Sequence, residues 1–177
     1  MSESVNLGEF LAKYTQRLLS TTAKSIEDLS PDELHFQGHP DANSIGFDAW
    51  HIARTADNLV HFAFEREQPV WLQQGLNEAW ELPKADQGTG MDPATAHALR
   101  FPDAKLLAQY CRDVSSAIVP RMEKMSQDYL TTTTVIKPQG EMARLDVINQ
   151  VIVVHGNNHL GQISLARTLQ GKPGLGF

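Results

Sequence analysis

Hydrophobic residues recur at steps of three and four along four stretches of the chain, which is the period of an amphipathic helix. The first stretch runs from about Val5 to Ser25 and the second from about Asn43 to Glu65. The third begins near Pro102, and the fourth runs from about Met142 to Leu169. The expected core positions are Leu7, Phe10, Leu11, Tyr14 and Leu18; Ile45, Ala49, Ile52, Ala56 and Leu59; Leu106, Tyr110, Val114, Ala117 and Ile118; and Leu145, Ile148, Ile152, His155, His159, Ile163 and Ala166. This pattern predicts an all-α fold, an antiparallel four-helix bundle.

A long connection from Pro69 to about Phe101 separates the second and third helices, so the bundle need not be simply up-down-up-down. It contains WLQQGLNEAW, which favours a short helix, and the turn-rich ADQGTGMDPAT, and a crossover of this length usually shapes a site. SPDEL predicts a capped short turn. Pro120 is expected to kink or end the third helix, and TTTTVIKPQG indicates an extended connection with room for a brief strand.

Length and charge narrow the class of protein. A chain of 177 residues suits one domain, residues 1–177, and its net charge of −6 argues against nucleic acid or an anionic membrane as a partner. The lone Cys111 allows no intrachain disulfide and is expected to be a small buried hydrophobe. No signal peptide or membrane-spanning run is visible. A cytoplasmic protein is expected.

Two histidines interrupt the apolar face of the fourth helix. In VVHGNNHLGQI, His155 and His159 lie one turn apart on the same face, where two imidazoles can chelate one divalent metal. Gly156 and Gly161 flank them, and each weakens a helix, which suggests the close approach of another element. This spacing alone leaves open that both histidines are merely hydrogen-bonded inside the bundle.

A transition-metal site also needs a third protein ligand, and His51 is the candidate. It lies midway along the second helix in NSIGFDAWHIARTADN, with Asp48 and Thr55 on its own face. Three imidazoles from two helices would form a neutral triad that suits Zn²⁺ or Ni²⁺.

The remaining histidines are weaker candidates. His35 and His39 have the same spacing, but Gly38 and Pro40 break any helix there, so both are expected in a loop. His61 is expected at the surface or the bundle edge, and His97 has no assigned role. The Glu-x-x-His pairs of a ferritin-like di-iron site are absent from the sequence.

Two motifs point to a known family. NSIGFDAWHIARTADNLV, followed about a hundred residues later by VVHGNNHLGQISLARTLQGKPG, resembles the DinB-like metal-dependent superfamily, which includes bacillithiol S-transferases and mycothiol-dependent maleylpyruvate isomerases. The resemblance implies a four-helix bundle, often a homodimer, with three histidines on a divalent metal. By motif these fall on His51, His155 and His159. Asn158 stands where relatives often carry another histidine, a departure that can change the local hydrogen bonding.

The expected chemistry is metal-dependent, although no catalytic residue can be named. A cation held by three neutral imidazoles can lower the pKa of bound water or bind a thiol as the thiolate. The resulting hypothesis is an enzyme that activates a low-molecular-weight thiol, of the S-transferase or isomerase type, on a small-molecule substrate. The alternatives are a hydrolase that uses metal-bound water and a non-catalytic metal-stabilised bundle. Hydrogen-bond partners for the ligating imidazoles are sought among four neighbouring residues, Asp48, Asn157, Asn158 and Gln162.

Overall fold

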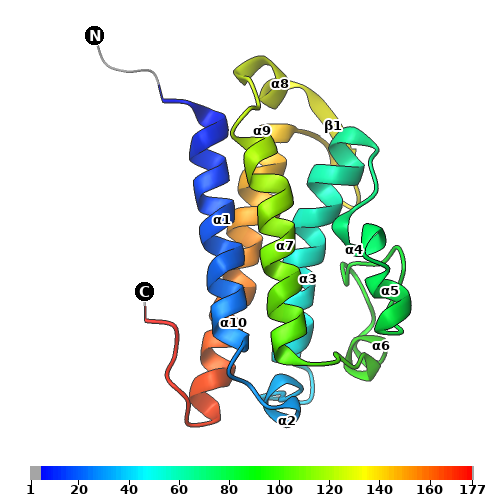
Figure 1. The fold of residues 1–177 in the computed structure, drawn as a ribbon, viewed down its shortest axis with the longest axis vertical. Helices are drawn as coiled ribbons and strands as arrows, with labels where there is room; N and C mark the ends of the chain where they lie inside the picture. The colour runs from blue at the N-terminus through cyan, green and yellow to red at the C-terminus, as the bar shows by residue number, and fades with distance from the viewer. Residues whose placement is uncertain (1–4, 177) are drawn as a thin grey trace.

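Four long helices pack side by side in the computed structural model, which describes residues 5–176 (Figure 1). Two of the four continue through a π-helical segment, in which the backbone turn is wider than in an α-helix. The four are α1 (Leu7–Ile26), α3 (Ile45–Asp57) with η1 (Asn58–Phe64), α7 (Ala104–Met122), and η2 (Val147–Val154) with α10 (His155–Leu169). The predicted four-helix bundle is confirmed, whereas the π-helical segments were expected as ordinary α-helix.

The long crossover decides the direction of the helices. After η1 the chain returns along the outside of the bundle through α4 (Val70–Gln73), α5 (Leu76–Ala79) and α6 (Pro93–Ala98), so that α7 starts at the same end as α3 (Figure 1). As a result α3 and α7 run in one direction, and α1 and α10 run in the other. The bundle is therefore antiparallel by pairs of helices.

The second irregular region is a hairpin between α7 and η2. Strands β1 (Thr133–Ile136) and β2 (Gly140–Ala143) pair antiparallel, with Thr133 opposite Ala143 and Ile136 opposite Gly140. The short helices α8 (Gln127–Thr131) and α9 (Arg144–Asp146) flank the hairpin. The brief strand expected in TTTTVIKPQG is therefore present, and β1 also contacts η1.

Side-chain caps define where the helices begin. Asn6, Ser44 and Asp103 each accept a backbone N–H in the first turn of α1, α3 and α7, which replaces a partner that the helix itself cannot supply. The predicted capping box forms at the short α2 (Pro31–Leu34), where Ser30 and Glu33 bond to each other's backbone N–H. The start of each long helix is thus encoded locally.

Helix α3 is the centre of the bundle. It contacts α1, α7 and α10, and all 13 of its residues are buried. These include the polar residues Asp48, His51, Arg54, Thr55 and Asp57, although a buried polar group is costly unless it is paired. So many polar side chains on a wholly buried helix indicate a built polar site and not only a core.

Three residues that were expected in the core are exposed, and the structure of α7 at Pro120 differs from the expected kink or helix end. Phe10, Tyr14 and Leu106 are 49%, 36% and 52% exposed, because no described helix covers their side of α1 and α7. Pro120 lies inside the last turns of α7, which continues to Met122. The carbonyl of Ser116, which Pro120 leaves without its helical N–H partner, belongs to an exposed residue and can bond to water.

Within residues 5–176, no helix is both long enough and apolar enough to cross a membrane.

Candidate metal centre

Three imidazoles converge between α3 and α10, which are neighbours in the bundle. Nε2 of His155 lies 3.5 Å from Nε2 of His51 and 3.1 Å from Nε2 of His159. One ligand atom from each histidine lies within 4.8 Å of the other two, which is the geometry of a possible metal site. The structure therefore brings together the three residues that sequence spacing and motif had singled out.

The opposite ring nitrogens show that two of the converging atoms are acceptors. Nδ1 of His51 donates to the carbonyl oxygen of Gln87, and Nδ1 of His159 donates to the carboxylate of Asp48 at 2.9 Å. Because a carbonyl or carboxylate oxygen can only accept, the protons of His51 and His159 sit on Nδ1, and their Nε2 lone pairs face Nε2 of His155. Imidazole nitrogens that converge in this way form a donor set that fits a divalent metal.

Burial favours the neutral form of two of the three imidazoles, those of His51 and His155. His51 is 3% exposed, and its burial lowers its pKa from 6.5 to about 4. Burial, followed by the neighbouring His159, also lowers the pKa of His155. A metal therefore competes less with protons for these two imidazoles than it would for imidazoles in water.

Polar neighbours orient His159. Asp48 is 2% exposed, and its Oδ1 accepts from both His159 and Asn43. Oε1 of Gln162 shares the same His159 proton at 3.1 Å. Two of the four expected hydrogen-bond partners are thus in contact with a ligand imidazole. The other two face outward: Asn157 bonds to the carbonyl of Val153 and, like Asn158, is exposed.

The crossover forms the outer wall of the site. A cavity of about 280 Å³ opens onto the three histidines, and residues 88–91, Pro93, Ala96 and His97 from the crossover line it. Gly88 has φ of +96°, and a Cβ there would lie 2.8 Å from the ring of Phe47 and 3.1 Å from Nδ1 of His51. Only glycine therefore lets the loop come close enough for the Gln87 carbonyl to reach His51.

The other histidines lie outside the triad. Nδ1 of His35 bonds to the Pro31 carbonyl, and its Nε2 accepts the Phe101 N–H, so both ring nitrogens are used. His39 is exposed beside Asp41, as expected for a loop residue. The expectation for His61 was wrong: it is 1% exposed, because its Nδ1 donates to the buried carboxylate of Asp57 at 2.8 Å. His97 faces the cavity but does not belong to the three-histidine group.

Two smaller expectations concern residues beside the site. Cys111 is fully buried, and burial raises the pKa of its thiol to about 12, which suits a packing residue and not a nucleophile. A Cβ at Gly156 would lie 2.5 Å from a methyl group of Leu18, so this glycine does permit α10 to approach α1 closely. A Cβ at Gly161 would meet no described atom within 4 Å, so close packing does not explain that glycine.

Removal of the Asp48 carboxylate should weaken metal binding without removing a ligand. Asp48→Ala is expected to lower the affinity for Zn²⁺ by about 10- to 100-fold, because His159 loses the acceptor that orients it and raises its basicity. A competition titration with a chromophoric chelator measures this affinity. Asp41→Ala is the matched control, since Asp41 lines the same cavity but contacts no ligand imidazole. Equal losses in both variants would show that only the charge of the cavity matters.

The protein is a helical bundle in which three histidines from adjacent helices converge. Comparison with known proteins identifies its family. The family model of the DinB superfamily matches residues 14–163, and the chain belongs to that superfamily. A crystal structure of a conserved protein from Enterococcus faecalis has the same fold, with a TM-score of 0.80 and 19% identity over 96% of this chain and 100% of the other. No curated protein matches the chain in sequence.

Proposed function

We propose that the protein binds one divalent transition metal, Zn²⁺ or Ni²⁺, through Nε2 of His51, His155 and His159, and that it transfers or isomerises a substrate with the help of a small thiol. The observation that carries the proposal is the convergence of three Nε2 atoms, two of which belong to imidazoles whose Nδ1 protons are already held by acceptors. Three neutral imidazoles form a donor set that borderline-soft cations prefer.

The number of ligands favours a catalytic over a purely structural metal. The group consists of three histidines, and no fourth His, Cys or carboxylate within residues 5–176 joins it. Structural zinc sites are usually closed by four protein ligands, whereas catalytic sites keep a position for water or substrate. Here the remaining side faces the cavity of about 280 Å³, which leaves space for a small thiol or an electrophilic group.

The chemistry that the metal supplies when bound is a lowered pKa of a thiol or water in that open position. The chain's own residues do the rest. The Gln87 carbonyl and the Asp48 carboxylate hold two imidazoles in one tautomer and one orientation. Phe47 stacks on the His51 ring, with centroids 5.9 Å apart, and excludes water from that side. Cys111 is buried, so the attacking sulfur has to come from a separate thiol.

Turnover with a defined thiol and electrophile tests the proposal. Untagged protein is stripped with a chelator, reloaded with Zn²⁺ or Ni²⁺, and mixed with monochlorobimane and either cysteine or glutathione. We expect a new S–C bond with release of chloride and the thiol proton, at a rate that requires the metal and falls to background in His155→Ala. Fluorescence of the conjugate measures the reaction.

The same preparation separates the competing functions. Metal-dependent cleavage of a carboxylic ester in the absence of thiol would replace the transferase with a hydrolase. Stoichiometric metal binding with neither activity would replace the enzyme with a metal-stabilised bundle. Protein that binds no metal would contradict the proposal entirely.

A further inference from the structure

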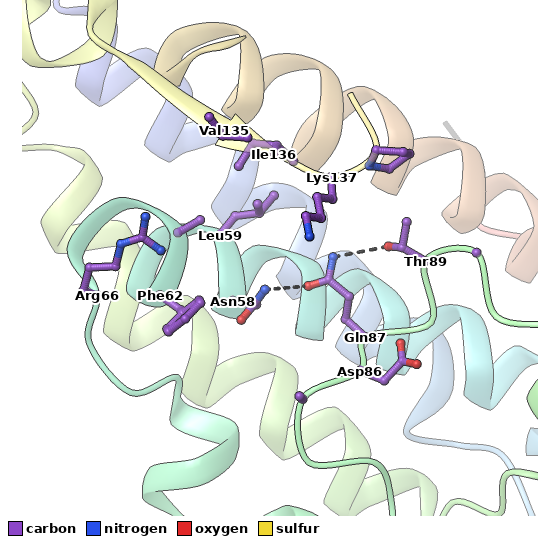
Figure 2. Close-up of a pocket in the computed structure, with 14 residues that line it drawn as sticks. Asn58, Leu59, Phe62, Arg66, Asp86, Gln87, Thr89, Val135, Ile136 and Lys137 are labelled. Carbon is purple, nitrogen blue, oxygen red and sulfur yellow. Dashed lines mark hydrogen bonds between the residues drawn. The ribbon is translucent and has the colours of Figure 1, made fainter. Parts of the chain in front are cut away.

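A second and larger cavity lies beside the metal centre. It measures about 570 Å³ and is bounded by η1 and Arg66 just after it, by the crossover loop, and by the end of β1 with the turn that follows (Figure 2). We call it the cationic groove, and it is lined by residues 58–59, 62–63, 66, 85–87, 89–90 and 135–138. Its volume falls in the range of pockets that hold small organic molecules, about 300–1,000 Å³.

One wall of the groove is apolar. Leu59, Phe62, Val135 and Ile136 contribute side chains to it, and Phe62 and Val135 are 49% and 71% exposed. Two of the exposed large hydrophobic residues of the chain thus line one hollow, from segments about seventy residues apart in sequence. Exposed hydrophobic side chains that cluster in one hollow often indicate a binding surface.

Two cations stand over this apolar wall. Arg66 lies against Phe62, with its guanidinium 5.5 Å from the ring centroid, and Lys137 extends from the hairpin turn toward Asn58 and Gln87 (Figure 2). Within residues 5–176 neither side chain forms an ion pair, whereas Arg112, Arg121, Arg167 and Lys172 all do. The groove is therefore positive in a chain whose net charge is −6.

The one carboxylate of the groove does not neutralise this charge. Oδ1 of Asp86 accepts the N–H of Gly88, so the side chain is turned to its own loop. The polar floor consists of amides instead: Asn58 donates to Gln87 at 2.9 Å, and Gln87 donates to Thr89 at 3.2 Å (Figure 2). An anion in the groove thus meets cations that form no ion pair, while the Asp86 carboxylate is already bonded to its own loop.

The cationic groove shares part of its wall with the cavity of the metal centre. Thr89 and Gly90 line both cavities. Gln87 joins them as well, because its side chain forms the floor of the groove while its carbonyl oxygen accepts from Nδ1 of His51. A molecule that lies in the groove is therefore separated from the cavity of the three histidines only by the loop that carries Gln87, Thr89 and Gly90.

We infer that the cationic groove binds the carboxylate and the apolar body of an amphipathic organic acid, such as an arylalkanoate. Its role as the substrate's non-reacting end rests on the function proposed above, whereas its ability to bind the acid does not. Arg66 holds the carboxylate beside Phe62, at the end of the groove away from Thr89, and Leu59, Phe62 and Val135 cover the apolar body (Figure 2). Lys137 adds positive charge nearer to Gln87. A membrane surface is a poor fit, because the rest of this acidic chain is repelled by anionic lipid.

Calorimetric titration of chelator-stripped protein tests the inference. The probes are 4-phenylbutyrate and its neutral counterpart 4-phenyl-1-butanol, which has the same apolar body. Without a metal, the carboxylate cannot bind as a metal ligand. We expect the acid to bind more tightly than the alcohol, and R66Q/K137Q to weaken the acid about tenfold while leaving the alcohol unchanged. Added salt should weaken the acid alone.

The control is K105Q/K124Q, which removes two exposed positive charges at α7 and just beyond its end, outside the groove. It should bind both probes as the unmodified protein does. Equal binding of acid and alcohol, or equal losses in the two double variants, would overturn the inference. Binding of vesicles that contain anionic lipid, in place of 4-phenylbutyrate, would also overturn it.

The outcome is separable from the fate of the proposed function. If His155→Ala binds 4-phenylbutyrate normally and no metal-dependent turnover exists, the groove is confirmed as an acid-binding site and the proposed enzymatic function is contradicted. If turnover exists, R66Q/K137Q should raise the KM for 4-(chloromethyl)benzoate about tenfold and leave the KM for neutral monochlorobimane unchanged. Unchanged KM values for both electrophiles would be consistent with the proposed enzymatic function, but they would show that the groove does not bind the substrate.

Discussion

His155→Ala should lower the affinity for Zn²⁺ by about a hundredfold or more, since a four-ligand zinc site gains about 10–16 kcal/mol and each ligand a sizeable share of it. His155 is the central member of the triad, because its Nε2 lies within 3.5 Å of the Nε2 atoms of both other histidines. Its loss leaves two imidazoles, too few to hold the cation firmly. Competition titration and elemental analysis of untagged protein measure the effect.

His97→Ala is the matched control for this substitution. His97 lines the same cavity but does not belong to the group of three, so its variant should bind Zn²⁺ as tightly as the unmodified protein. His51→Ala and His159→Ala should behave like His155→Ala. Unchanged metal stoichiometry in all three ligand variants would eliminate the metal centre. Circular dichroism confirms that each variant remains helical.

Asp57→Ala should destabilise the fold by about 3–5 kcal/mol, the cost of leaving buried charged and polar partners without their anion. Asp57 is 0% exposed, and its carboxylate accepts from the backbone N–H groups of Val70 and Trp71, the hydroxyl of Tyr110 and Nδ1 of His61, at 2.8–2.9 Å. The guanidinium of Arg54, which is 1% exposed, lies 3.9 Å away. One carboxylate thus joins α3, η1, α4 and α7. Urea denaturation measures the free energy of unfolding.

Two variants separate this network from a general effect of charge. Asp57→Asn keeps the volume and one acceptor oxygen, so it should lose less stability than Asp57→Ala. Asp128→Ala removes an exposed carboxylate in the first turn of α8 and should cost less than about 1 kcal/mol. A comparably small loss for Asp57→Ala would show that the buried network contributes nothing to stability.

The long helices were predictable because their signals are local. The spacing of Leu11 and Leu18, or of Ile148, Ile152 and Ile163, reports which face of a helix is buried whatever its neighbours are. The caps at Ser44 and Ser30 act within one turn. Where the signal depends on the neighbouring helix, prediction was wrong: Phe10, Tyr14 and Leu106 fit the apolar stripes but remain exposed.

The candidate site was likewise predictable only where its signals are local. The pair His155 and His159 follows from helical spacing, and motif resemblance pointed to His51, a hundred residues away. Gln87 carried no signal, since a backbone carbonyl contributes to a site through position alone and any residue type has one. The side-chain amide of Asn43 donates to Asp48, and the sequence analysis did not single it out. The burial of His61 was missed for a related reason: its partner, Asp57, is recognisable only when α4 and α7 are in place.

By itself the sequence determined the four helices, the face that His155 and His159 share and the imidazole side chains available for a metal, because periodicity and side-chain type are properties of neighbouring residues. Only the tertiary structure decided that α3 and α10 lie together, so that Nε2 atoms meet while Asp48 and Gln87 hold the opposite nitrogens. It also decided that the crossover and the hairpin enclose a positive groove beside them. Contacts between distant segments depend on how the whole chain packs, and no local pattern encodes them.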